Sequence, residues 1–320
     1  MTIIRVAKRK DLREIVSLHR QAGESQGQLD PRLAPAASDS VRFGSVLEAM
    51  IGRRWCRVLV AEEDMGLVGY AVGSPVDNEP FTASRFGLVG GLYVEQGQRG
   101  RGTKDALLEA LNGWFKEQGL AVTHVDVSCS DPAAQRFWER RGFGRFLDQL
   151  WWDGSSESYE PGDSPLVVRP ARSGDREAVL LLWKEMMDAH SAIDPRLSIA
   201  PDWRHEVARS VKRWLRDGDC RLVVAEAADG VIGFALGGLV DATLGLKPSM
   251  HGQVAHLCVG ANWRRRGIGR RLFWALIDWL VEGGVQSIHL YVSPLNPVSQ
   301  QFWRELGFED YICRLWCDLV

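Results

Sequence analysis

The chain has 320 residues, of which 45% are hydrophobic and 25% charged, and its net charge is −2 at pH 7. This length fits about two domains with cores of their own, and the near-neutral charge argues against a nucleic-acid-binding protein, which would carry a basic face. The six cysteines form no CxxC pair, so we expect no metal site and predict reduced thiols in a cytoplasmic protein. We expect no membrane contact, because no apolar run approaches the roughly 20 residues that span a bilayer and the N-terminal charges precede no signal-peptide core.

The chain contains an internal duplication. DPRL at 30–33 falls on DPRL at 194–197, an offset of 164 residues, and CRVLVAEE from position 56 falls on CRLVVAEA from position 220. After one inserted residue, FWERRGF from position 137 falls on FWRELGF from position 302. Such a sustained repeat indicates two homologous domains, predicted at 1–153 and 166–320. The polar stretch 154–165, which contains Pro and Gly, is the predicted linker between them.

Each half predicts the same order of elements. A short strand leads to an amphipathic helix, the DPRL loop, a second helix and two strands joined by tight Asp/Gly turns. A third long strand then runs into a glycine- and arginine-rich segment and a helix, and a strand, a helix and a final pair of strands close the half. The expected ranges include second helices at about 45–53 and 203–215, third long strands at 87–94 and 253–259, later strands at 122–128 and 287–293, and last helices at 132–141 and 297–306. The predicted fold is α+β, with a mostly antiparallel, twisted sheet and helices on both faces.

The stretch NWRRRGIGRRLF at 262–273 places five arginines around a Gly-Ile-Gly, where an apolar helical pattern begins. A helix N-terminus already carries partial positive charge, so these cations need a compensating anion. A Walker loop is excluded because Gly269 is followed by Arg270 rather than by Lys and Ser or Thr, and a dinucleotide fingerprint because no third glycine follows. The segment predicts a pyrophosphate held by backbone N–H groups and arginines. The alternative is a solvated, basic helix start.

With these residues, the chain resembles the GNAT superfamily of N-acetyltransferases. Its members carry V-x-P-x-x-R-G-x-G-I-G before a helix, followed by an Asn, an Ala, Phe-Tyr and Gly-Phe. The second half is similar in VGANWRRRGIG (259–269) and NPVSQQFWRELGF (296–308), and the first half in VEQGQRGRGTK (94–104) and DPAAQRFWERRGF (131–143). Ala261 replaces the usual Pro, and Arg265 the usual Gly. The resemblance spans nearly the whole chain and implies transfer of an acetyl group from acetyl-CoA to a primary amine of a small molecule or protein.

The resemblance also implies the residues that hold acetyl-CoA. The loop would hold the pyrophosphate, the strand before it would pair with the pantetheine, and one strand amide would polarise the thioester carbonyl. No metal is implied. The implied cofactor-binding residues are Leu257, Cys258, Val259, Arg264, Arg265, Arg266, Gly267, Ile268, Gly269, Arg270 and Asn296.

The two halves differ at these positions. The first half has Thr103 and Lys104 in place of the Ile-Gly that opens the helix, and Asp131 in place of the family Asn. Its third long strand carries no ionisable group after Arg85 that could serve as a base. We therefore predict that the second half binds acetyl-CoA and catalyses, and that the first half is a degenerate scaffold.

Acyl transfer to an amine needs a base for the ammonium. Family bases lie six and four residues before Val259, where this chain has Gln and Ala. Strand alternation places His251 on the same face and His256 on the opposite one. His251, directly or through water, is therefore the predicted base, and His256 a core residue. Glu226, near a strand end, is a weaker candidate.

The general acid is also unusual. The family Tyr of the Phe-Tyr pair is Trp303 here, and an indole N–H does not titrate usefully. Tyr291 is the predicted proton donor, with a water, or no acid at all, as alternatives.

The repeated DPRL allows two interpretations. As structure, Asp-Pro opens a turn and the Arg and Leu pack across it, which its presence in both halves favours. As function, the loop borders the acceptor site in this family, and Asp194 and Arg196, with His190 nearby, would bind the acceptor.

Two rival functions remain open: a non-catalytic acetyl-CoA-binding or scaffold protein, and a nucleic-acid-binding module that uses the arginines. The second predicts a steep salt dependence and is opposed by the net charge. Since tandem halves can replace a homodimer, we expect a monomer with pseudo-twofold symmetry.

Overall fold

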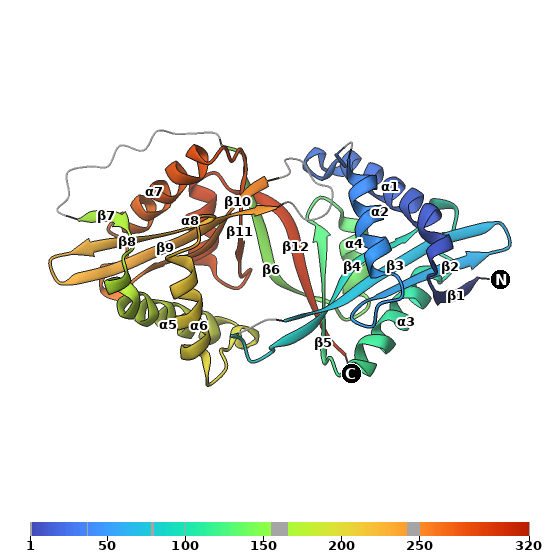
Figure 1. Cartoon of the computed structure of the whole chain (residues 1–320), viewed down its shortest axis with the longest axis horizontal. Coiled ribbons are helices and arrows are strands. Elements are labelled where there is room, and N and C mark those ends of the chain that lie inside the picture. Colours follow the sequence, from blue (N-terminus) through green and yellow to red (C-terminus); the bar gives the residue numbers. More distant parts are fainter. Residues whose placement is uncertain are drawn as a thin grey trace.

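The computed structural model describes residues 2–36, 38–77, 80–98, 100–154, 166–241 and 250–319, and its two halves repeat one order of elements (Figure 1). The first half contains β1 (Ile3–Val6), α1 (Leu12–Leu29), α2 (Asp39–Met50), β2 (Arg57–Glu63), β3 (Gly66–Asp77), β4 (Arg85–Val94), α3 (Thr103–Glu117), β5 (Val122–Ser128), α4 (Pro132–Glu139) and β6 (Gly144–Trp152). The second half contains β7 (Val167–Pro170), α5 (Arg176–Ile193), α6 (Trp203–Trp214), β8 (Cys220–Ala227), β9 (Gly230–Asp241), β10 (Met250–Val259), α7 (Ile268–Glu282), β11 (Ile288–Val292), α8 (Pro297–Glu305) and β12 (Glu309–Asp318). Among the residues described, each half ends in one strand, so the expected final pair was wrong. Of the predicted linker, residues 155–165 lie outside the described residues.

The strands form one continuous sheet in the order β1-β2-β3-β4-β5-β12-β6-β11-β10-β9-β8-β7. The pairs β4–β5 and β10–β11 are parallel, and the other described pairs are antiparallel, so the mostly antiparallel sheet is confirmed. The last strand of each half lies beside strands of the other half. β12 pairs with β5, β6 pairs with β11, and β6 and β12 pair with each other at the centre. The halves therefore exchange their C-terminal strands.

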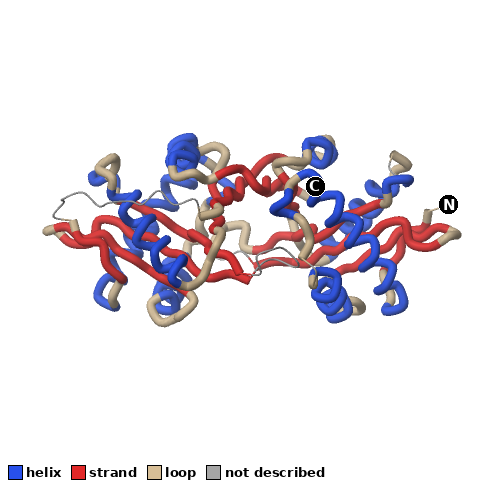
Figure 2. The backbone as a smooth tube through the Cα atoms, turned by 90° about the horizontal axis from the view of Figure 1, so that it is seen from above, coloured by secondary structure: helices blue, strands red, loops and turns tan. Residues whose placement is uncertain are grey.

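Helices cover both faces of this sheet, as predicted (Figure 2). Alternation along β3 sends Tyr70 into the cluster with α1 and α2, and Ala71 into the cluster with α3. Along β9, Phe234 packs with α5 and α6, and Ala235 with α7. The helices α1, α2, α5 and α6 thus lie on one face, and α3, α4, α7 and α8 on the other.

Glycines of β3 and β9 allow the long helices to lie close to the sheet. A Cβ atom at Gly73 would come within 2.6 Å of the Phe115 ring of α3. At the matching position of β9, a Cβ atom on Gly237 would lie 2.8 Å from both the Leu276 side chain of α7 and the Gln253 carbonyl oxygen. Since a larger residue would push α3 or α7 away, these glycines set how closely the two helices lie on the sheet.

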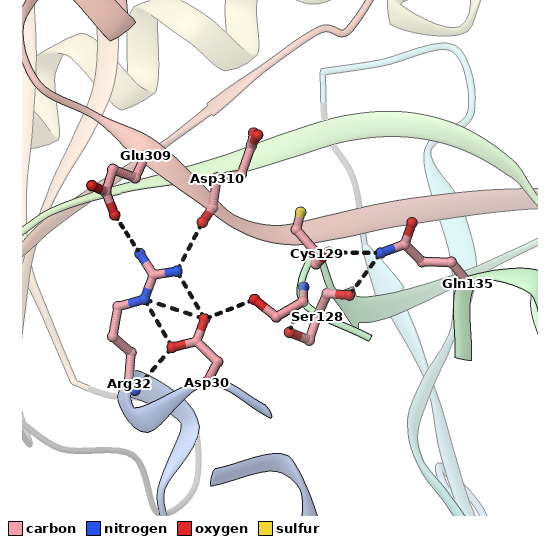
Figure 3. A network of polar contacts seen from close by, with 8 residues as sticks. Asp30, Arg32, Ser128, Cys129, Gln135, Glu309 and Asp310 are labelled. Carbon is pink, nitrogen blue, oxygen red and sulfur yellow. Dashed lines mark hydrogen bonds and ion pairs between the residues drawn. The ribbon is translucent and has the colours of Figure 1, made fainter. Parts of the chain in front are cut away.

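Each DPRL segment forms a short 3₁₀ turn that holds the exchanged strand. In the first half, the Asp30 carboxylate accepts hydrogen bonds from the Arg32 backbone N–H at 3.0 Å and from its guanidinium at 2.8 Å. The same guanidinium donates to the carbonyl of Asp310 on β12 at 2.9 Å and lies 3.6 Å from Glu309 (Figure 3). The turn therefore joins the first half to the last strand of the second.

Candidate active site

β10 separates from β11 at the predicted cofactor site. Their parallel ladder joins Gly252–Val254 to Ile288–Leu290 and ends there, whereas β10 continues along β9 as far as Val259. A register shift between Val254 and His256 leaves Ala255 as a bulge. From the bulge onward, β10 has no ladder partner on its β11 side among the described strands. The strand that was expected to pair with pantetheine, Leu257–Val259, belongs to this unpaired edge.

The loop after β10 leads into a helix whose first N–H groups are uncapped. Gly267 is the N-cap of α7, has a left-handed backbone with φ 76°, and no side chain caps the helix. Arg265 is also left-handed, with φ 61°, where the first half has Gly100 with φ 79°. Left-handed residues in such loops turn backbone N–H groups toward an anion, and the first turn of a helix adds its own unpaired N–H groups. This backbone fits a bound pyrophosphate.

The loop arginines differ in their partners. Arg264 donates to the carbonyl of Val259 at 2.9 Å and to Glu185 of α5 at 2.7 Å. Arg266 donates to a loop carbonyl at 3.1 Å and lies over the Trp263 ring, while Arg270 lies 4.0 Å from a carboxylate of α8. Within the described part of the chain, Arg265 has no such partner. Its charge is therefore the one most available to an anion.

Asn296 caps the helix α8 that follows β11. Its side-chain oxygen accepts a hydrogen bond from the backbone N–H of Ser299 at 3.0 Å, as expected of an N-cap residue. Asp131 of the first half makes the same bond with Ala134 at 2.8 Å. The Asn-to-Asp difference therefore preserves the cap, and only the Asn leaves an N–H₂ group for a cofactor. Trp303 of α8 is buried in the core below α7.

The bulge at Ala255 changes the expected positions of the β10 histidines. His251 pairs with Val240 of β9 and His256 with Leu236. Val240 and Leu236 are four residues apart and therefore point to the same face of the sheet, so both histidines lie on the face of α5 and α6. The expectation of opposite faces was wrong, because one extra residue reverses the alternation.

Neither histidine has the environment of an exposed base. His251 is 4% exposed, its Nδ1 lies 2.9 Å from the Ser287 hydroxyl, and burial lowers the pKa of its imidazole. His256 is half-buried, and its Nε2 accepts a hydrogen bond from the Trp183 indole at 3.4 Å. Burial, and to a lesser extent His190, lower the pKa of His256 to about 4.

Tyr291 of β11 is part of a hydrogen-bonded network that includes residues of both halves. Its hydroxyl accepts a hydrogen bond at 3.1 Å from Arg314 of β12, which is itself paired with Asp126 of β5 at 2.8 Å. Burial raises the pKa of Tyr291, despite the opposing effect of the guanidinium. The phenol is therefore protonated at neutral pH.

The predicted acceptor-binding pair is engaged within the protein. Asp194 is buried and accepts from the Arg196 guanidinium at 2.7 Å, and Arg196 donates to the carbonyl of Arg145 on β6 at 3.1 Å. This geometry supports the structural interpretation of DPRL. The weaker base candidate, Glu226, is ion-paired with Arg169 at 2.7 Å.

The first half keeps the backbone of the site but not its side chains. Its parallel ladder likewise ends at Val89, and its helix α3 begins at an uncapped Gly102 with φ 81°. The Lys104 ammonium, however, lies 4.1 Å from the centre of the Phe137 ring. In the second half, the ring at that position is Phe302, which would lie 3.5 Å from a Cβ on Gly269. A lysine at this position therefore covers the aromatic ring beside the helix start.

Three residues near the site lie outside the sequence motifs. Glu185 of α5 accepts hydrogen bonds from the Ala261 N–H at 2.9 Å and from Arg264, and so fixes the loop. Arg314 positions the Tyr291 hydroxyl. Asp148 of β6 bonds to α8 across the boundary between the halves. No local spacing identifies them, because each acts on a segment distant in the chain.

None of the helices described is both long and apolar enough to cross a membrane. In the same part of the chain, no three His, Cys, Asp or Glu side chains are grouped to hold a metal ion.

Residues 28–143 and 183–308 each match the sequence profile of the acetyltransferase (GNAT) family. The chain belongs to this family. The mycothiol acetyltransferase of Actinosynnema mirum is 27% identical over 272 residues, 79% of this chain and 80% of that protein. The mycothiol acetyltransferase of Kocuria rhizophila is 26% identical over 307 residues, 93% of this chain and 92% of that protein.

Two solved structures share the fold over nearly the whole chain. The GCN5-related N-acetyltransferase from Sphaerobacter thermophilus has a TM-score of 0.64 at 16% identity and covers 99% of this chain and 96% of its own. A tandem GNAT protein from the clavulanic acid biosynthesis pathway has a TM-score of 0.59 at 15% identity. The match covers 100% of this chain and 99% of that protein. The two predicted GNAT domains are therefore confirmed as a fold.

Proposed function

We propose that this chain is an acetyl-CoA-dependent N-acetyltransferase that acts on a primary amine of a small molecule or protein, with the chemistry in its second half. The observation that carries the proposal is the unpaired edge of β10 leading into the uncapped start of α7 at Gly267. An extended pantetheine needs such a strand edge, and a pyrophosphate needs such N–H groups. The residues proposed to hold acetyl-CoA are Leu257, Cys258, Val259, Arg265, Arg266, Gly267, Ile268, Gly269 and Asn296, with Arg264 and Arg270 supporting the loop.

Acetyl-CoA supplies the acetyl group as an activated thioester. The protein's part is to orient the reactants and to manage protons. Tyr291 is the proposed proton donor, since its raised pKa keeps it protonated and its oxygen, not its hydrogen, is used by Arg314. Neither histidine of β10 is free to act as a base: the Nε2 atom of His256 accepts the hydrogen bond from Trp183, and His251 is buried. Removal of the amine proton is therefore proposed to use water, with His251 acting at most through it.

A site without a strong base favours a weakly basic acceptor. An α-amino group has a pKa of about 8, whereas a lysine side chain has one of about 10, so at pH 8 about half of the former but only about 1% of the latter is neutral. The similarity to mycothiol acetyltransferases also favours a small-molecule acceptor over a protein.

The proposal is tested with the full chain by incubation with acetyl-CoA and a panel of amines at pH 7.5, with released thiol as the readout. We expect turnover with α-amino compounds, and little with ε-amino groups. Gly269→Lys should abolish turnover by covering Phe302, whereas Gly269→Ala should retain it, since a Cβ there meets its neighbours at 3.5 Å. Equal turnover in the Gly269→Lys variant would contradict catalysis by the second half.

One observation favours a second candidate, a non-catalytic acetyl-CoA-binding protein. Trp303 occupies the position at which the family has the Tyr that serves as general acid, and its side chain is buried, with 8% exposed. Tight acetyl-CoA binding, with no release of free CoA thiol in the presence of any amine of the panel, would establish this alternative.

A further inference from the structure

Asp148 is a buried carboxylate at the boundary between the halves. It lies on β6, the last strand of the first half, opposite Val292 of β11 and Cys313 of β12. Its side chain is 3% exposed; one oxygen accepts from Arg145 at 2.7 Å, and the other from Gln300 of α8 at 2.8 Å. Burial of a carboxylate is costly unless each oxygen is hydrogen-bonded, and here both oxygens are.

Gln300 extends this contact to the proposed cofactor site. Its side-chain N–H₂ also lies 3.4 Å from the carbonyl of Ser293, where the turn after β11 begins, and its backbone N–H donates to the Asn296 carbonyl at 3.0 Å. The Asn296 N–H in turn donates to the Ser293 carbonyl at 3.1 Å. Gln300 thus forms hydrogen bonds with the turn that carries Asn296, and Asp148 fixes the Gln300 side chain by a further hydrogen bond.

The first half lacks the corresponding carboxylate. Gln135 of α4 matches Gln300 and donates to the carbonyls of Ser128 and Cys129, at 3.0 Å each (Figure 3). The residue that matches Asp148 is Cys313 of β12, at the offset of 165. The exchange of strands is therefore symmetric in backbone, but at this pair of matched positions only β6 carries a carboxylate.

We propose that Asp148 is a positioning residue that the first half contributes to the second, where it fixes the Asn296 turn for acetyl-CoA. The inference rests on the proposed function of that turn. It gives the degenerate half a specific role: the cofactor site is incomplete without a side chain from the other domain.

Variants of the full chain test the proposal through acetyl-CoA affinity, measured by calorimetric titration. Asp148→Leu is similar in volume but accepts no hydrogen bond, and Gln300→Ala removes the intermediate contact. Both should weaken acetyl-CoA binding about tenfold. Asp148→Asn keeps an acceptor oxygen for Gln300 and should bind within about threefold of the natural chain.

The matched control is Gln135→Ala, which alters the equivalent contact of the first half and should leave acetyl-CoA affinity unchanged. Natural affinity in Asp148→Leu and Gln300→Ala would overturn the positioning role. An equal loss in Gln135→Ala would also overturn it, since that would indicate general loosening of the fold. If the natural chain does not bind acetyl-CoA at all, the proposed function fails and this inference with it. If Asp148→Leu does not fold, Gln300→Ala decides alone.

Discussion

The Arg196 guanidinium donates a hydrogen bond to the backbone carbonyl of Arg145 at 3.1 Å and stacks 4.9 Å from the centre of the Phe146 ring. This contact ties the DPRL turn of the second half to the strand that the first half contributes. Arg32 makes the equivalent contact with Asp310 in the first half. A motif that could bind an acceptor is instead used to hold the two exchanged strands.

Arg196→Ala should therefore destabilise the protein rather than change acceptor recognition. The Asp194 carboxylate, 2% exposed, would remain buried without its partner, and we expect the free energy of unfolding to fall by about 2–3 kcal/mol. Urea denaturation measures this change. Arg204→Ala, which removes an exposed ion pair with Glu177, should cost less than about 1 kcal/mol. A raised acceptor KM with unchanged stability would contradict this interpretation.

The second half expressed alone, residues 166–320, should not be a monomer. It lacks β6, which pairs with both β11 and β12 in the full chain. Because β12 is the homologue of β6, β12 of a second copy can take that place, which gives a closed twofold dimer. Light scattering should find a dimer for this fragment and a monomer for the full chain. A monomeric fragment with natural acetyl-CoA affinity would show that the exchanged strand is dispensable.

Arg265→Gly should separate stability from binding. The left-handed backbone of Arg265, with φ 61°, costs an L-residue about 1–2 kcal/mol that glycine largely avoids. We expect the free energy of unfolding to rise by about 1 kcal/mol, while acetyl-CoA binds more weakly through loss of a cation. Arg265→Ala should weaken binding without the gain in stability. Unchanged affinity in both variants would exclude Arg265 from the anion site.

His289 should make the protein less stable in mild acid. Burial, with smaller effects of His251 and Arg314, lowers the pKa of its imidazole to about 4. Below about pH 6.5 the unfolded chain binds a proton at this imidazole, whereas the folded chain does not until about pH 4. The contribution of His289 to the free energy of unfolding is therefore fully present above pH 7. It is lost as the pH falls from about 6.5 toward 4, at up to about 1.4 kcal/mol per pH unit. Urea titrations at pH 7.5 and 5 should show a smaller loss in His289→Phe than in the natural chain. An equal loss would contradict this assignment.

The sequence repeat predicts much of the fold, since matched glycines, strands and loops recur at fixed offsets. The second helix of the first half, expected at 45–53, instead spans Asp39–Met50. Its apolar periodicity is weak and its first residues follow a proline-containing loop, so the start lacked a clear signal. The strand exchange could not be predicted, because β6 and β12 are homologous and their apolar patterns do not indicate which half each strand joins.

The candidate site was predicted where backbone chemistry determines it, at Gly267 and the loop before it. The side chains around it were not, because one bulge at Ala255 reverses the alternation of β10. The contacts of Arg264 with Glu185 and of Gln300 with Asp148 join residues distant in the chain. Such contacts depend on tertiary packing, which spacing along one segment does not encode.

The central strands of the sheet pair late during synthesis, because they are far apart in the chain. β5 needs β12 as its neighbour, and the two pair from Val122 with Asp318 to Ser128 with Ile312. Until β12 has left the ribosome, β5 lacks this neighbour, and Val125 and Val127 lack the contacts that Cys313 and Leu315 of β12 make in the same cluster. Such edges attract other strands, and contacts of long sequence separation form slowly. The nascent first half therefore cannot pair β5 with its native neighbour before β12 has been synthesised, and during this interval the unpaired edge can promote aggregation.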